Sequence, residues 1–323
     1  MRLARIFLAI AALALSVGAG PAHAQAPVRM LVGYPPGGAI DTLGRLFAEK
    51  LAEGLGRPVV VEIRAGAASQ IAAAALKAAP PDGNTLMVSP EAPIVLSPHT
   101  VKTPLPYNTL TDFQPVAHIG NLTYALAVSA GVPANDLKEW LNWVRAGGRN
   151  AAYATPGAGT TPQFLGVTLA QAAGVQLVHV PYRGVAPAFV DLMGGQVPAA
   201  MLPLAQLLPT MKSGKFRVLA QTAGGRVTAA PDIPSFKELG YQGLEISGFY
   251  GIYAHAGVRP EVIARYNQII IQSLRTPDMR ERMRTLDLEI QEMSPAEMAA
   301  MIKTQYDRWG PIVKASGYSV DSQ

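Results

Sequence analysis

The sequence predicts a two-lobed α/β protein in which each lobe holds a mostly parallel sheet flanked by helices. Short apolar runs alternate with helical patterns along the chain, which is typical of parallel strands covered by helices on both faces. The length of 323 residues suggests two domains rather than one. With 49% hydrophobic and 15% charged residues, the chain is too apolar to be disordered.

The first residues resemble an export signal. The basic residues Arg2 and Arg5 precede an apolar run from Ile6 to Val17, and Ala22-His23-Ala24 has the small-residue pattern of a signal peptidase site. The apolar run is shorter than the ~20 residues that span a bilayer. We therefore expect residues 1–24 to be a signal peptide, cleaved before Gln25, and the mature protein to be periplasmic. An N-terminal membrane anchor is the alternative.

The remaining elements follow in order from apolar pattern and turn residues. We expect strands at Val28–Gly33, Val59–Ile63, Thr85–Ser89, Tyr124–Ser129, Ala151–Thr155, Leu177–Pro181, Ala199–Leu202, Arg217–Gln221 and Leu244–Ala254. We expect helices at Asp41–Gly54, Ser69–Ala79, Asn135–Ala146, Thr161–Ala173, Ala186–Met193, Leu204–Ser213, Pro260–Ser273, Asp278–Thr285 and Pro295–Ser316. In the first helix, Asp41 is the expected N-cap, and Gly54 and Gly56 end the element.

Two extended runs, Tyr124–Ser129 and Leu244–Ala254, lie where the chain would cross between lobes. We therefore expect residues 25–123 to form the first part of lobe 1 and residues 124–247 to form lobe 2. Residues 248–323 would then return to lobe 1 and supply its C-terminal helices.

Two loops of similar design join a buried strand to a helix. They are Gly33–Asp41 and Thr155–Pro162, and both are rich in glycine and proline. Glycine allows a ligand to approach the backbone closely, and the following helix presents unpaired N–H groups and the positive end of its dipole. Each loop is therefore a candidate anion site, and a carboxylate suits it better than a pyrophosphate. An ordinary strand-to-helix turn is the alternative for either loop.

Most catalytic chemistry is disfavoured. The chain has no cysteine, its histidines show no metal-binding spacing, and no nucleotide or hydrolase motif is complete. We expect no catalytic residue, metal or cofactor. The net charge of +5 is spread thinly, so nucleic acid is not an expected partner. We expect His179 and the three tryptophans to pack in the interior, and Tyr250 in the second crossing segment to be a candidate ligand contact.

Several short motifs occur in an order that resembles a known family. They are Pro36-Gly37-Gly38-Ala39-Ile40-Asp41, Pro81-Asp82-Gly83-Asn84-Thr85-Leu86, His179-Val180-Pro181-Tyr182-Arg183-Gly184 and Asp191-Leu192-Met193-Gly194-Gly195-Gln196. This series resembles the tripartite tricarboxylate transporter substrate-binding proteins, the Bug family of periplasmic receptors, from about Val28 to Trp309.

The resemblance implies a type II periplasmic binding protein, or Venus flytrap. Such a receptor is not an enzyme: it closes over a small organic carboxylate and delivers it to the membrane permease of a tripartite transporter. We expect it to be a monomer. The resemblance places two groups of residues at the ligand: Tyr34, Gly38, Ala39, Asp41, Ala67, Ala68 and Ser69 in lobe 1, and Thr155, Gly159, Thr160, Thr161 and Gln163 in lobe 2.

Four departures from the family pattern bear on the ligand. Arg64 replaces a usual Asn, Ser89-Pro90-Glu91 brings an acid to the cleft, Phe164 replaces a common His, and Met201-Leu202-Pro203 lacks the usual Asp-Asn. Ser89 and Glu91 therefore join the candidate ligand contacts. These departures disfavour a standard dicarboxylate and leave open an apolar or aromatic acid, or a ligand with a cationic group. Alternatively, Arg64 and Glu91 point to water or pair with each other.

The function we expect is that of an exported receptor for a small organic anion. A periplasmic hydrolase or isomerase on the same two-lobed fold is one alternative, and a ligand sensor for a two-component system is another. Main-chain N–H groups carry no side-chain signature, so the sequence does not name the ligand.

Overall fold

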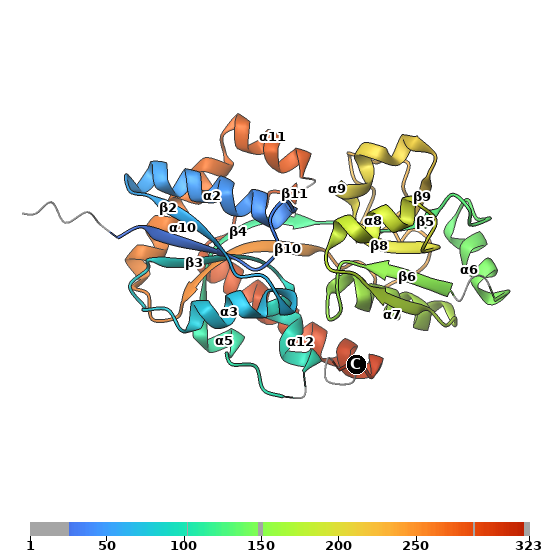
Figure 1. The fold of residues 1–323 in the computed structure, drawn as a ribbon, viewed down its shortest axis with the longest axis horizontal. Coiled ribbons are helices and arrows are strands. Elements are labelled where there is room, and N and C mark those ends of the chain that lie inside the picture. Colours follow the sequence, from blue (N-terminus) through green and yellow to red (C-terminus); the bar gives the residue numbers. More distant parts are fainter. Residues whose placement is uncertain (1–25, 102, 148–150, 287, 320–323) are drawn as a thin grey trace, which may run out of the picture.

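The chain forms two lobes, each built on its own β-sheet (Figure 1). The computed structural model describes residues 26–101, 103–147, 151–286 and 288–319. The expected signal peptide lies outside the described residues. Among the helices described, none is long and apolar enough to cross a membrane.

The sheet of lobe 1 has six strands in the order β11-β4-β10-β3-β1-β2. Strands β2, β1 and β3 pair in parallel, whereas β10 runs antiparallel to both β3 and β4. Their bounds are β1 Val28–Val32, β2 Val59–Ile63, β3 Thr85–Pro90, β4 Phe113–Leu122, β10 Gly248–His255 and β11 Leu288–Glu289.

The sheet of lobe 2 has five strands in the order β7-β6-β8-β5-β9. Strands β7, β6 and β8 pair in parallel, whereas β5 runs antiparallel to both β8 and β9. Their bounds are β5 Tyr124–Ser129, β6 Ala152–Thr155, β7 Val178–Pro181, β8 Ala199–Pro203 and β9 Phe216–Gln221.

The strand that enters each lobe from the other runs against its neighbours. The chain leaves lobe 1 at the end of β4, enters lobe 2 as β5, and returns to lobe 1 as β10. Strands β5 and β10 are therefore the elements through which the lobes are connected. The other main strands of each sheet point one way, so their carboxyl ends and the loops that follow them share one edge.

Helices cover the sheets, and short helical turns join them. The α-helices are α2 Ala39–Leu55, α3 Gln70–Lys77, α4 Ser97–Thr100, α5 Thr109–Asp112, α6 Leu137–Arg145, α7 Thr161–Ala173, α8 Val185–Met193, α9 Leu204–Leu207, α10 Pro260–Leu274, α11 Pro277–Thr285 and α12 Pro295–Ser316. The 3₁₀ and π turns are η2 Ala67–Ser69, η3 Ala92–Leu96 and η5 Leu208–Ser213.

The expected strands and long helices are present, with shifts of one to a few residues at their ends. Four elements differ from the expectations. Strand β4 was not expected at all, nor was the two-residue β11. The expected strand Leu244–Ala254 begins only at Gly248, and the expected helix Leu204–Ser213 is a single turn, α9, followed by the 3₁₀ turn η5.

Large aromatic side chains anchor the interior, as expected for two of the three tryptophans. Trp140 on α6 and Trp309 on α12 are almost fully buried, and Trp143 is half-buried against the same core. Helix α12 contacts β4 of lobe 1 and also α7 of lobe 2, so it joins the two lobes on the side of the molecule where the chain ends (Figure 1).

Candidate functional site

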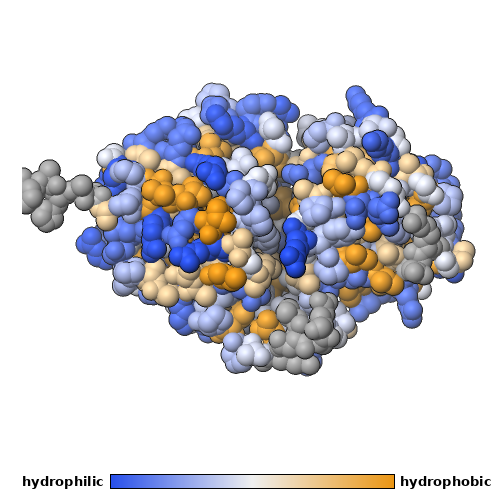
Figure 2. Space-filling view, in the orientation of Figure 1, coloured by the Kyte–Doolittle hydropathy of each residue, from blue (hydrophilic) through white to orange (hydrophobic). Residues whose placement is uncertain are grey.

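A cavity of about 490 Å³ lies between the lobes, within the range of small-molecule sites. The surface is hollowed between the two halves of the molecule (Figure 2). Lobe 1 and the crossing segments supply residues 34–40, 42, 90–92, 122–124, 250, 286 and 288 to its lining. Lobe 2 supplies residues 156, 160, 162, 183–187, 203, 205 and 206.

The first glycine-rich loop forms one wall. Gly38 has an extended backbone and is the N-cap of α2, so the N-terminal N–H groups of a 17-residue helix open at the cavity. Gly37 has a φ of +91°, which glycine adopts without strain. A Cβ atom added to Gly38 would meet no atom within 4 Å, so this wall is open space at Gly38.

Asp41, in the first turn of α2, is hydrogen-bonded to this loop. It is the third helical residue and not the N-cap, which corrects the expected start of the helix. Its carboxylate accepts a hydrogen bond from the Gly37 N–H at 3.0 Å and pairs with Arg45 at 3.0 Å. Burial acts to raise the pKa of this carboxyl, but Gly37 and Arg45 hold it below its usual value. Asp41 is therefore used in shaping the loop, and it is not among the lining residues.

The second glycine-rich loop forms the opposite wall at the start of α7. Thr160 is the N-cap, and its hydroxyl donates to the Gly157 carbonyl at 2.7 Å. Gly159 has a φ of +70°, and its N–H donates to Gln163 Oε1 at 2.7 Å. These bonds fix the loop so that Pro156, Thr160 and Pro162 line the cavity.

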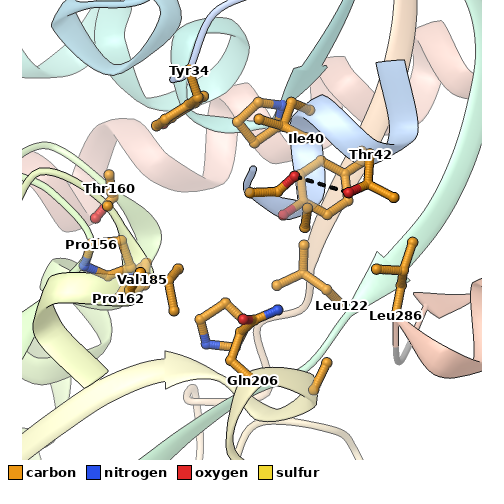
Figure 3. A pocket seen from close by; sticks show the side chains of 18 of the residues that line it. Tyr34, Ile40, Thr42, Leu122, Pro156, Thr160, Pro162, Val185, Gln206 and Leu286 are labelled. Atoms are coloured by element: carbon orange, nitrogen blue, oxygen red, sulfur yellow. Dashed lines mark hydrogen bonds between the residues drawn. The ribbon is translucent and has the colours of Figure 1, made fainter. Parts of the chain in front are cut away.

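The two loops thus meet at one cavity, one from each lobe. In Figure 3, Tyr34 and Ile40 lie on one side of the space, and Pro156, Thr160, Pro162 and Val185 lie on the other. Both walls are the N-terminal ends of helices of more than ten residues, and both ends favour a negative charge.

Glu91 is the only acid among the described lining residues, and it is almost completely buried. Its Oε1 atom accepts hydrogen bonds from the hydroxyls of Tyr124 at 2.9 Å and Thr161 at 2.5 Å. Its Oε2 atom accepts one from the Phe249 N–H at 3.3 Å. Burial raises the pKa of the Glu91 carboxyl, and the three hydrogen bonds oppose that rise.

Tyrosines surround Glu91. Tyr34, Tyr124 and Tyr250 line the cavity with it. Burial raises the pKa of each of these phenols, and the neighbouring Glu91 carboxylate raises it further. The phenols therefore stay protonated and can donate hydrogen bonds at neutral pH.

Six of the residues expected at the ligand line the cavity: Tyr34, Gly38, Ala39, Glu91, Thr160 and Tyr250. The others lie behind the walls or beside them: Asp41, Ala67, Ala68, Ser69, Ser89, Thr155, Gly159, Thr161 and Gln163. Of these, Thr161 donates a hydrogen bond to Glu91, which lines the cavity. Gly159 and Gln163 are hydrogen-bonded to each other within their loop.

The segment Ala67–Ser69 has an uncommon backbone. All three residues have a positive φ, between 46° and 73°, although none is a glycine. A Cβ atom on Gly33 would lie 1.7 Å from Ser69 Oγ, so the segment packs directly against the end of β1. The segment therefore packs against Gly33, where the first loop begins.

Two of the expected departures lie away from the cavity between the lobes. Arg64 is exposed and pairs with Glu62 at 2.5 Å, so it does not pair with Glu91. Phe164 is fully buried and packs against Trp309 and Tyr318. Met201 and Leu202 are buried in β8, whereas Pro203 reaches the lining.

His179 is only half-buried in lobe 2, so it is less enclosed than expected. It lies in β7 with its Nε2 atom 2.7 Å from the Thr155 hydroxyl, and its ring lies 5.3 Å from that of Tyr153. Burial lowers its pKa to about 4. Thr155 is thereby engaged in the interior, where its hydroxyl also donates to the Gly157 carbonyl at 3.0 Å.

Sequence reasoning missed several lining residues. Gln206 on α9 is half-buried and lines the cavity from lobe 2 (Figure 3). Arg183 is an exposed lining residue, and Leu286 lines the cavity from lobe 1. Arg183 lies in a motif that the family resemblance had already singled out, whereas no local signal marks Gln206 or Leu286. Among the described residues, no cluster of three His, Cys, Asp or Glu side chains is placed to hold a metal ion.

Comparison with known proteins places this geometry in a family. Residues 43–318 match the model of the family described as tripartite tricarboxylate transporter family receptor. A solved structure described as a periplasmic transporter is 30% identical, covers 92% of this chain and 99% of its own, and has a TM-score of 0.85.

Two further solved structures contain carboxylates. Rpa4515 of Rhodopseudomonas palustris, with adipate, is 27% identical, covers 91% of this chain and 98% of its own, and has a TM-score of 0.84. MatC of the same organism, with bound malate, is 27% identical, covers 89% of this chain and 98% of its own, and has a TM-score of 0.81. The two-lobed fold with mainly parallel sheets is thus confirmed.

Proposed function

Because the chain belongs to the tripartite tricarboxylate transporter family receptors, which bind solutes, we propose that it captures a small organic carboxylate between its lobes. The observation that carries this proposal is the meeting of two helix N-termini, those of α2 and α7, at one cavity. The start of α2 presents main-chain N–H groups to the space. At the start of α7, Pro162 has no N–H and the N–H groups of Gly159 and Gln163 are bonded within the loop, so α7 favours an anion mainly through its dipole. The similar structures with adipate and with malate support the ligand class.

The energies are sufficient without a buried basic residue. Binding at micromolar concentration requires about −8 kcal/mol. A hydrogen bond to a charged group contributes roughly 1.5–3 kcal/mol, and a helix terminus adds about 0.3–1 kcal/mol. Four or five donors, from the main-chain N–H groups at the start of α2 and the phenols of Tyr34 and Tyr250, can therefore supply the affinity even after the entropy of association is subtracted.

Export and delivery complete the proposal. The N-terminal pattern of residues 1–24 supports secretion to the periplasm with cleavage before Gln25. Ligand bound to both walls would favour the closed arrangement of the lobes, which a permease can then distinguish from the open one. The receptor would release the solute unchanged to that permease.

A ligand screen tests the function. Purified mature protein is heated with mono-, di- and tricarboxylates and aromatic acids, and the solution is analysed by mass spectrometry after incubation. At a carboxylate concentration of about 100 times Kd, binding adds about 2.7 kcal/mol to the free energy of unfolding. We expect a raised Tm with the acid recovered intact. Conversion of the acid, or no response to any carboxylate, would contradict the proposal.

A further inference from the structure

The Glu91 carboxylate reaches from lobe 1 to the start of helix α7 in lobe 2. Its Oε1 atom accepts a hydrogen bond from Thr161, the first residue of that helix, and Tyr124 donates to the same atom. Glu91 itself follows β3 in lobe 1, so a lobe 1 carboxylate sits at the anion-favouring end of a lobe 2 helix.

The hydrogen bonds match an ionised carboxylate. Three donors, two hydroxyls and the Phe249 N–H, point at its two oxygens. An ionised carboxylate accepts all three bonds at full strength, whereas a protonated one accepts them more weakly and adds an O–H donor to a group already surrounded by donors. The side chain is 3% exposed, so little of its surface is left for a ligand to contact.

The rest of the cavity offers little to a second ligand charge. Ile40, Leu122, Val185 and Leu286 are apolar, and the prolines add further apolar surface. Among the described lining residues, Arg183 is the only basic side chain, and it is exposed. A second ligand carboxylate would thus face Glu91 without a buried cation to balance the two charges.

We propose that Glu91 is a resident anion that restricts the cleft to monocarboxylates with an apolar body. This inference rests on the proposed carboxylate function and narrows its ligand class. Adipate and malate, which the two similar structures contain, are dicarboxylates, so the chain would differ from those proteins in specificity. A ligand ammonium group is disfavoured because Glu91 is already hydrogen-bonded three times and is almost completely covered.

Matched pairs of acids test the inference. Isothermal titration compares butanoate with succinate, hexanoate with adipate, octanoate with suberate, and benzoate with terephthalate, and 6-aminohexanoate is added as the zwitterion of the hexanoate length. In the unaltered protein we expect the best monocarboxylate to bind at least about tenfold more tightly than its dicarboxylate partner and than the zwitterion.

Two substitutions separate charge from hydrogen bonding. Glu91→Gln keeps the size and removes the charge, and we expect it to reduce the preference for the monocarboxylate about tenfold. Thr161→Val removes one hydrogen bond and leaves the charge, so the preference should persist even where overall affinity falls. Circular dichroism and Tm identify any variant that fails to fold. In that case the comparison of ligand pairs in the unaltered protein alone tests the proposed role of Glu91.

The outcomes distinguish the two proposals. Equal or tighter binding of dicarboxylates by the unaltered protein, tighter binding of the zwitterion, or an unchanged preference in Glu91→Gln overturns the role of Glu91 and leaves the carboxylate receptor intact. Failure of every acid to bind either protein overturns the receptor function together with the inference.

Discussion

Trp309 of α12 packs against Phe164 of α7, with ring centroids 5.9 Å apart. Both side chains are almost completely buried. Since α12 also contacts β4 of lobe 1, this aromatic pair joins a C-terminal helix of one lobe to a helix of the other. The lobes are therefore in contact at a site separate from the crossing strands β5 and β10.

Replacing Trp309 with Ala should destabilise the protein strongly. Removal of a buried Trp leaves a cavity and costs about 3–5 kcal/mol. Urea unfolding measures the loss. Trp143→Ala is the matched control, because Trp143 is only half-buried on α6 and should cost less. A loss for Trp309→Ala no larger than that for Trp143→Ala would show that the contact between α12 and α7 contributes little.

A side chain at Gly38 should block ligand binding without unfolding the protein. The backbone of Gly38 is extended, and a Cβ atom there meets no other atom, so Gly38→Val projects only into the cavity. We expect the ligand-induced rise in Tm to disappear while the Tm of the free protein changes by little. Gly131→Val is the control, since Gly131 is equally open but lies outside the cavity lining. A normal ligand response in Gly38→Val would show that the first loop does not contact the ligand.

The two loops could be predicted because their signals are local. A buried strand, a glycine-rich turn and an amphipathic helix follow one another directly in Gly33–Asp41 and again in Thr155–Pro162. Strand β4 was missed because Pro115, His118 and Gly120 interrupt its pattern, and its pairing with β10 and β11 is a tertiary effect.

The walls of the cavity also combine features with a local sequence signal and features that depend on tertiary contacts. Gln206 and Leu286 reach the cavity from α9 and the end of α11, far along the chain from either loop. Glu91 was recognised as a departure from the family pattern, but its burial depends on Tyr124, Thr161 and Phe249, which come from three other elements. Local sequence thus identified residue types, and only the fold showed how they are partnered.

Gln206 should contribute to ligand affinity and little to stability. Its amide is half-buried in the wall of lobe 2, where it can donate to a ligand oxygen. Loss of one hydrogen bond to a charged group costs roughly 1.5–3 kcal/mol, so Gln206→Ala should weaken binding by about tenfold or more. Titration with the best acid of the screen measures this, and Gln171→Ala on the exposed face of α7 is the control. Equal affinities of the two variants would remove Gln206 from the site.

The stability of lobe 2 should decrease as the pH falls between about 6.5 and 4, in part through His179. Burial lowers the pKa of this imidazole from 6.5 to about 4, so folding favours its neutral form. The contribution is complete above pH 6.5, declines as the pH falls through that value, and stops changing below pH 4. His179→Gln keeps a donor for the Thr155 hydroxyl but does not titrate. Urea unfolding at a series of pH values should therefore show a shallower decrease in His179→Gln than in the unaltered protein. Parallel curves for the two proteins would assign the pH dependence to other groups, such as the buried His118, whose pKa burial also lowers.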